Sequence, residues 1–332
     1  MEIYTDPSQL APYVTGGSTA TIGNFDGVHK GHQALIAAAV AKARALGVPA
    51  IVITFTPHPL QVLLKENAPP TLMALDIKLQ KLEELGVDIT LVLPFTHALA
   101  KQTPEEFVQQ VLVNQLHLRF LAVGYDYAFG KNRRGTAAVL ASLGQQHGFT
   151  VEQIAAVPVN GTIVSSTAIR EALCLGRVDI AEALLGHPHL IRGEVIHGKG
   201  RGGSQLGFPT ANLAPREDTL LPAEGVYAVF TRIRTAAGTA PGPWHRALAS
   251  VGTNPTFQDG SLRAEIHLLD FDQDLYGKTL EVAFAAFLRD QKTCSGIEEL
   301  VNMIHQDVRD ARRCLETKTL PNGLPGQPKE HV

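Results

Sequence analysis

The stretch 23-GNFDGVHKGH-32 combines glycines with two histidines at a spacing that suits phosphate chemistry. His29 and His32 lie close enough in the sequence to converge on one group. Imidazole rings can donate hydrogen bonds to phosphoryl oxygens and so stabilise charge that grows in a transition state. Glycines let the backbone approach such a phosphate closely. We therefore expect His29 and His32 to be catalytic. The phosphate-binding residues expected beside them are Gly23, Phe25, Asp26 and Gly27.

Two other interpretations of the histidine pair stay open at the level of the sequence. An isolated pair at this spacing is often a pair of solvated surface side chains, and it can also supply two ligands of a zinc site. A zinc site needs further ligands, and no feature of the sequence designates one. The stretch lacks the Lys-Ser/Thr ending of a Walker A motif, so an ordinary P-loop is not expected.

The elements around the pair predict where it lies in a fold. The run 18–25 is typical of a buried strand, 31–47 is alanine-rich and helical, and 49–55 is a second β-branched run. This order of elements implies a parallel sheet, whose ligands bind at the carboxyl ends of the strands. A helix N-terminus at that edge favours phosphate. Residues 103–106 have the signature of a helix start with a capping box. The alternation continues with helices expected at 76–85, from Thr103 and at 136–147, strands at 89–95, 118–127 and 150–157, and closing helices over 166–176 and up to Gly186.

A second polar cluster begins the helix expected at 166–176. Ser165, Ser166 and Thr167 supply hydroxyl and N–H groups at a helix N-terminus, and Arg170 adds a planar guanidinium about one turn later. Such a cluster can hold phosphates. Taken alone, it is most often a helix cap followed by a surface arginine.

The pattern changes after residue 186. Strand-like runs follow one another with Gly, Pro, Asp and Asn turns between them and without intervening helices, which predicts a small antiparallel barrel. The segment 296–315 is an exception: its apolar residues at 297, 300, 301, 304 and 308 predict a helix with one apolar face against the barrel. The tail from Thr317 is polar and rich in Pro and Gly, and is expected to be disordered.

Two segments of this second half carry residues suited to phosphate transfer. The stretch 198-GKGRGGSQLGFPTAN-212 could fold over phosphates through Gly198, Lys199, Gly200 and Arg201, although alone it is typical of a mobile basic hairpin. In 263-RAEIHLLDF-271, strand alternation places Glu265 and His267 on one face and Ala264, Ile266 and Leu268 on the other. A glutamate at such a position usually faces solvent.

Composition limits the classes of protein to consider. The 332 residues are enough for about two domains, and 45% hydrophobic with 18% charged residues indicates a globular chain. Twenty-nine basic and 32 acidic residues give a net charge near zero, which does not suggest a surface that binds nucleic acid or membranes. Three scattered cysteines, no signal-peptide pattern and no apolar run near the ~20 residues that span a bilayer predict a cytoplasmic protein.

The first half resembles a known superfamily. G-x-F-D-G-x-H-x-G-H is similar to the signature of the HxGH nucleotidyltransferases in their bacterial FAD synthetase branch, and 54-TFTPHP-59, 124-GYDYAFGKNRRG-135 and 164-VSSTAIR-170 match that branch in order. The resemblance implies adenylyl transfer, in which the phosphate of FMN attacks the α-phosphorus of ATP and pyrophosphate leaves. It also implies that S-S-T-x-x-R holds the triphosphate and that His58 and Asp126 lie at the flavin. Such a transfer needs alignment and charge neutralisation more than a protein nucleophile.

The second half is similar to the riboflavin kinase family. The resemblance rests on G-x-G-R-x-x-x-x-x-G-F-P-T-A-N and on the segments 225-GVYAV-229, 251-VGTNPTF-257 and 274-DLYGKTLEV-282. It implies that Thr210 and Asn212 coordinate Mg²⁺ together with nucleotide phosphates, for which neutral oxygen ligands are suitable. It further implies that Glu265 is the base that takes the proton from the 5′-hydroxyl of riboflavin.

These resemblances lead to one expectation for the whole chain. We expect a doubly wound α/β nucleotidyltransferase (HxGH) domain over 1–186, then a small antiparallel β-barrel riboflavin kinase domain with a C-terminal helix over 187–316, and a disordered tail over 317–332. The expected function is conversion of riboflavin to FMN and of FMN to FAD with ATP and Mg²⁺. The alternatives are that only the adenylyltransferase is active, or that the chain is a non-catalytic flavin-binding sensor.

Overall fold

A computed structural model describes residues 1–131, 134–196, 208–215, 219–234, 242–253 and 262–321. The chain divides into two compact units, one with residues 1–71 and 75–165 and the other with 72–74 and the chain from Ser166 onward. The boundary expected between the two catalytic domains lies after residue 186. The two helices before this residue belong to the second compact unit, so the division into units does not test that boundary, which stays a prediction. In the described part of the chain, no helix is long and apolar enough to cross a membrane.

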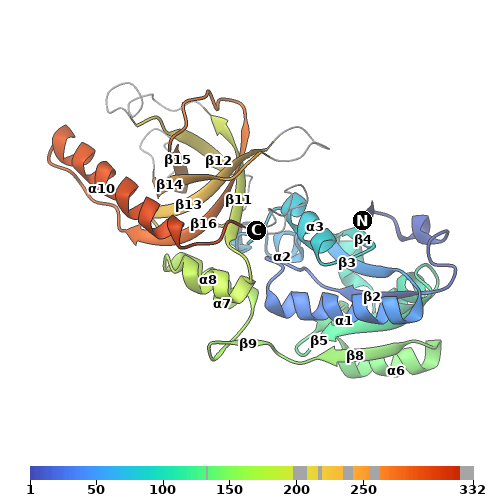
Figure 1. Ribbon diagram of the computed structural model, residues 1–332. Coiled ribbons are helices and arrows are strands. Elements are labelled where there is room, and N and C mark those ends of the chain that lie inside the picture. The colour runs from blue at the N-terminus through green and yellow to red at the C-terminus, as the bar shows by residue number, and fades with distance from the viewer. Residues whose placement is uncertain (132–133, 197–207, 216–218, 235–241, 254–261, 322–332) are drawn as a thin grey trace. The chain divides into compact units, whose positions relative to one another are not determined.

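The first unit is built on a parallel sheet with the strand order β1-β4-β3-β2-β5-β8 (Figure 1). The chain runs outward from β2 in both directions, because β3 lies on one side of β2 and β5 on the other. The carboxyl end of β2 is therefore the topological switch point, where doubly wound folds bind their ligands. The predicted doubly wound class is confirmed. The strands are β1 (Glu2–Tyr4), β2 (Ser18–Ile22), β3 (Ala50–Thr56), β4 (Ile89–Pro94), β5 (Leu118–Gly124) and β8 (Thr150–Ile154).

The main helices of this unit begin and end near the predicted residues. Gly47 ends α1 with φ 64°, a left-handed conformation that glycine adopts without strain. The predicted capping box is present, since the Thr103 N–H donates to Glu106 Oε2 at 2.8 Å and the Glu106 N–H donates to Thr103 Oγ1 at 3.2 Å. The helices are α1 (Lys30–Leu46), α2 (Pro59–Leu64), α3 (Leu75–Glu84), α4 (His97–Lys101), α5 (Pro104–Phe107) with a π-helical continuation over Val108–Val113, and α6 (Ala137–His147).

The second unit contains a closed antiparallel barrel, as predicted, and its strand order is β11-β12-β15-β14-β13-β16. Helix α8 packs against β11 and β16, and α10 lies beside the barrel against β13, β14 and β16 (Figure 1). The strands are β11 (His189–Ile196), β12 (Ala211–Pro215), β13 (Gly225–Arg234), β14 (His245–Thr253), β15 (Leu262–Leu268) and β16 (Thr279–Arg289), and the helices are α7 (Ser166–Cys174), α8 (Val178–Leu185) and α10 (Ile297–Glu316).

Helix α10 docks through a face that differs in part from the predicted one. Ile297 is 66% exposed, so its predicted place on the docking face is wrong. The buried positions lie further along the helix, at Asp307, Ala311 and Leu315. Asp307 tolerates burial because it forms a two-point ion pair with Arg289, at 2.7 Å for each contact. Of the predicted tail, residues 322–332 lie outside the described part, and Lys318 pairs with Glu182 at 3.1 Å.

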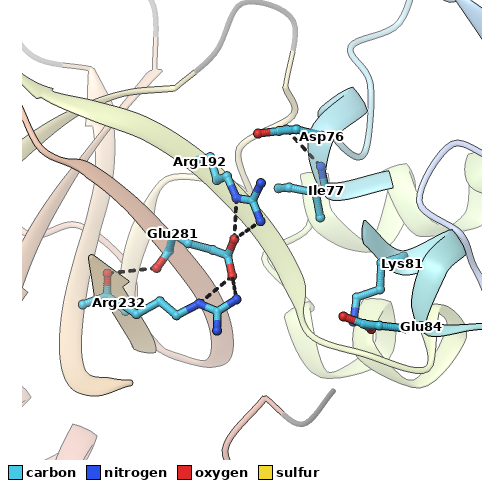
Figure 2. A network of polar contacts seen from close by, with 8 residues as sticks. Asp76, Ile77, Lys81, Glu84, Arg192, Arg232 and Glu281 are labelled. Atoms are coloured by element: carbon cyan, nitrogen blue, oxygen red, sulfur yellow. Dashed lines mark hydrogen bonds and ion pairs between the residues drawn. The ribbon is translucent and has the colours of Figure 1, made fainter. Parts of the chain in front are cut away.

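A buried carboxylate joins three strands of the barrel. Glu281 of β16 is fully buried and pairs in register with Arg192 of β11 and Arg232 of β13. Figure 2 shows its carboxylate between the two guanidinium groups, with Arg232 Nε and Nη2 at 2.9 and 2.6 Å from Oε1 and Arg192 bound to Oε2. The Arg232 guanidinium also lies over the ring of Trp244, with its carbon atom 4.4 Å from the ring centroid.

Replacement of Glu281 by glutamine should destabilise the barrel by about 3–5 kcal/mol, because it removes the buried negative charge that the two guanidinium groups share. Trp244, the single tryptophan, reports unfolding of this region by fluorescence in urea. The matched control is Asp270→Asn, which removes the ion pair between Arg312 and a 73% exposed Asp270 side chain and should cost far less stability, because solvent screens an exposed pair. Equal losses for the two variants would contradict a structural role of the buried triad.

Candidate functional site

The histidine loop, residues 23–32, follows β2 at the switch point of the first unit. The strand predicted over 18–25 ends at Ile22 because the loop turns sharply: Phe25 has φ 48° and Val28 has φ 41°. Such values are rare outside glycine, and they persist only where surrounding structure holds them. The Gly23 N–H donates to the Ile53 carbonyl at 3.1 Å, which ties the loop to β3.

The two histidines of the loop stack at the start of α1. Their ring centroids lie 3.5 Å apart with an interplanar angle of 13°, and the edge of Phe25 contacts His32 at a centroid distance of 5.2 Å. His29 caps the helix, since its Nδ1 accepts the N–H of His32 at 3.2 Å. The pair therefore converges as predicted, and it does so where the partial positive charge of a helix N-terminus favours phosphate.

His32 is held in its neutral form. Burial, and then the neighbouring His29 and Lys78, lower the pKa of His32 well below its ordinary value. Its Nδ1 atom is buried and has no hydrogen-bond partner among the described residues. A neutral imidazole can still donate one hydrogen bond to a phosphoryl oxygen, so this environment is compatible with the predicted role.

Lys78 of α3 is a member of this site that the motif comparison does not reveal. The residue is 6% exposed, and its Nζ donates to the carbonyl of Asn24 in the histidine loop at 2.7 Å. Burial lowers the pKa of Lys78, and the charge of the buried Asp26 acts in the opposite direction. The available signal in the sequence is weak: Lys78 falls beside Ile77 on the side of α3 that faces the core.

The segment before the S-S-T motif lies against the histidine loop. A Cβ atom at Gly31 would lie 3.2 Å from the His29 ring and 3.9 Å from the carbonyl oxygen of Val164, so glycine allows this approach. Ser165 follows directly, within the same unit. Ser166 and Thr167 open α7 and Arg170 follows in it, which places all three in the second unit. Their contact with a triphosphate stays a prediction.

The two residues predicted to bind flavin follow strands of the same sheet. Asp126 is exposed just after β5, and a side chain at Gly124 would lie 3.5 Å from its Oδ1 atom and 4.0 Å from Leu35 of α1. His58 follows β3 and caps α2, since its Nδ1 accepts the N–H of Leu60 at 3.2 Å. His58 therefore has a structural role, and flavin binding by either residue stays a prediction.

A second constellation forms on the barrel. Asn212 of β12 lies directly opposite Glu265 of β15, which lies directly opposite Ser250 of β14. Residues paired in this way project to the same face of the sheet. Glu265 is half-buried there, while Ala264 and Ile266 are fully buried on the other face, as strand alternation predicts. Two residues predicted from separate motifs are thus immediate neighbours.

Neighbouring contacts hold the P-T-A-N segment at this face. His267 Nδ1 lies 2.8 Å from the carbonyl of Pro209, which ties the segment to β15 beside Thr210. The Phe208 ring contacts His267 edge-on, and it contacts His305 of α10 in the same way. The glycine-rich stretch with Gly198, Lys199, Gly200 and Arg201 lies outside the described residues, so its phosphate contacts stay a prediction.

The donor atoms of this face suit a hard cation. A threonine hydroxyl and an asparagine amide oxygen are the neutral oxygen donors that Mg²⁺ accepts when phosphates and waters complete its octahedron. Thr210 is only partly exposed and Asn212 lies at the start of β12 beside the Glu265 carboxylate, so the residues fit the ion. In the first unit, the zinc interpretation gains no support: across the described residues no cluster of three or more His, Cys, Asp or Glu could hold a metal.

Two family models match the chain, one on each half. The model described as FAD synthetase matches residues 12–168, and the model described as riboflavin kinase matches residues 185–315. The first match contains the histidine loop and the second contains P-T-A-N and Glu265.

Known relatives share both halves. A bifunctional riboflavin kinase/FMN adenylyltransferase of Haemophilus influenzae is 38% identical over 90% of this chain and 94% of the relative. One of the same description from Pseudomonas fluorescens is 41% identical over 89% of this chain and 92% of the relative. A crystal structure described as a macrolide-efflux protein from Streptococcus pneumoniae aligns with 94% of this chain and 99% of its own, at a TM-score of 0.82 and 32% identity. From its sequence and from both matched models, the chain belongs to the family of bifunctional riboflavin kinase/FMN adenylyltransferases.

Proposed function

We propose that this protein phosphorylates riboflavin at the barrel and adenylylates the resulting FMN at the histidine loop, with one ATP for each step. The observation that carries the proposal is the direct pairing of Asn212 with Glu265, which joins two separate motifs into one constellation far along the chain from the histidine pair. Each half of the chain thus has the residues for its own chemistry.

In the kinase step, Glu265 acts as the base. Its carboxylate takes the proton of the riboflavin 5′-hydroxyl as that oxygen attacks the γ-phosphorus of ATP, and ADP leaves. Thr210 and Asn212 would hold Mg²⁺, which neutralises phosphate charge when bound. Gly198, Lys199, Gly200 and Arg201 are proposed to cover the nucleotide phosphates.

In the adenylyl transfer step, a phosphate oxygen of FMN attacks the α-phosphorus of ATP and pyrophosphate leaves. His29 and His32 donate hydrogen bonds to the oxygens that gain charge, while the loop backbone at Gly23, Phe25, Asp26 and Gly27 binds the phosphates. Ser165, Ser166, Thr167 and Arg170 are proposed to hold the triphosphate, and His58 and Asp126 the flavin. The substrates are therefore riboflavin, FMN and ATP, without a nucleic-acid or membrane partner. The three cysteines, all free thiols, are consistent with a proposed place in the cytoplasm.

Product analysis tests both steps at once. The purified protein is incubated with riboflavin, ATP and Mg²⁺, and the flavins are separated by chromatography. Formation of FMN followed by FAD supports the proposal. Conversion of added FMN alone would reduce the function to the adenylyltransferase, and recovery of unchanged riboflavin and FMN would leave a flavin-binding sensor.

A further inference from the structure

The histidine loop contacts a buried cation whose role the two reactions above do not include. Lys78 reaches the loop from α3, a helix that carries none of the motifs described so far. Its ammonium group donates to the Asn24 carbonyl at 2.7 Å. The Thr54 hydroxyl at the end of β3 donates to the same carbonyl at 3.2 Å. One backbone oxygen of the loop is therefore fixed from two separate elements.

The charges around this contact form a small buried set. On the loop, Asp26 is 3% exposed and His29 is 6% exposed, and from α3 comes Lys78, also 6% exposed. The positive charge of Lys78 acts on His32, and the negative charge of Asp26 acts on Lys78. Burial makes these interactions stronger than they would be in water, because the local dielectric constant is low.

We propose that Lys78 is a positioning residue of the adenylyltransferase site, which acts on His32 and on the backbone of the histidine loop and not on the substrate. The inference rests on the proposed function of that loop. The ammonium group fixes the Asn24 carbonyl, and its charge opposes protonation of His32. His32 then meets the α-phosphate as a neutral hydrogen-bond donor, in a loop whose strained backbone is already held in place.

The consequence is a change in pH dependence when the charge of Lys78 is removed. Loss of this charge removes one of the causes that keep the pKa of His32 low. In Lys78→Met the His32 pKa should therefore rise. The acidic limb of the kcat profile for FMN adenylylation should move to higher pH by the same amount. Lys78→Arg keeps the charge and should leave that limb in place, even if kcat falls.

The test combines the pH profile with a direct titration of His32. Nitrogen-15 NMR of the labelled histidine rings, assigned with His32→Gln, follows its protonation in the wild type, Lys78→Met and Lys78→Arg. The matched control is Lys81→Met, since Lys81 lies on the same helix, is 9% exposed and pairs with Glu84 at 2.9 Å. The thermal unfolding of each variant, followed by far-ultraviolet circular dichroism, reports whether the chain is folded.

The outcomes separate the inference from the function on which it rests. A raised His32 pKa and a shifted acidic limb in Lys78→Met, with neither change in Lys78→Arg or Lys81→Met, support the proposal. An unchanged His32 titration in Lys78→Met, or an equal shift in Lys78→Arg, would overturn it. If the wild type forms no FAD from FMN, the proposed function fails, while the NMR titration still decides whether Lys78 acts on His32.

Discussion

Glu265→Gln should abolish FMN formation from riboflavin and leave the conversion of added FMN to FAD unchanged. Glutamine keeps the size of the side chain and its place opposite Asn212 and Ser250, but it has no carboxylate to accept the proton of the 5′-hydroxyl. Removal of a general base costs about 10²–10⁴-fold in rate. We expect that loss in kcat, with little change in KM for riboflavin.

The matched control for this variant is Glu298→Gln. Glu298 is an exposed glutamate in the first turn of α10, so its replacement by glutamine should leave both activities at the wild-type level. Loss of both activities in Glu265→Gln would contradict the assignment of separate sites. Normal FMN formation would show that Glu265 is not the base.

His32→Ala should have the opposite effect: FMN accumulates from riboflavin, and FAD formation falls by about 10²–10³-fold, the usual loss when a donor to a developing oxyanion is removed. His32 is the more informative of the two histidines, because His29 also caps α1 and its removal would weaken the helix.

His147→Ala serves as the control for removal of a histidine. His147 is exposed in the last turn of α6, just before β8 begins, and so lies at the edge of the sheet opposite the histidine loop. Its replacement should leave FAD formation unchanged. If His32→Ala formed FAD at the wild-type rate, the loop could not be the adenylyltransferase site.

The long, strongly patterned elements were predictable from the sequence alone. Alternation of β-branched and alanine-rich runs identified β2, α1 and β3, and Gly47 marked the end of α1 as found. The elements that were missed are short: β1 has three residues and α4 has five, too few for a periodic pattern to register. The strand predicted to Phe25 ends at Ile22, because the chain turns at Phe25 with a positive φ angle. Positive φ angles at residues other than glycine cannot be predicted from the residue type.

Local sequence patterns indicate which face or element a candidate site residue lies on, but not which residues it contacts. Strand alternation placed Glu265 on the polar face, but only the register between β12 and β15 brings it opposite Asn212. The cap that His58 forms on α2 and the buried ammonium of Lys78 depend on tertiary packing, and lysine side chains are ordinarily solvated. Ile297 shows the opposite error. Helical spacing predicts it on the docking face of α10, but its side chain is 66% exposed.

The most direct test of the central claim, one complete active site in each half of the chain, is a mixing experiment. His32→Ala and Glu265→Gln are incubated together with riboflavin, ATP and Mg²⁺, and FAD is quantified by chromatography. Each variant alone should form little FAD from riboflavin, whereas the mixture should form FAD at a much higher rate once FMN has accumulated. A mixture in which FMN accumulates and no FAD follows would contradict the claim.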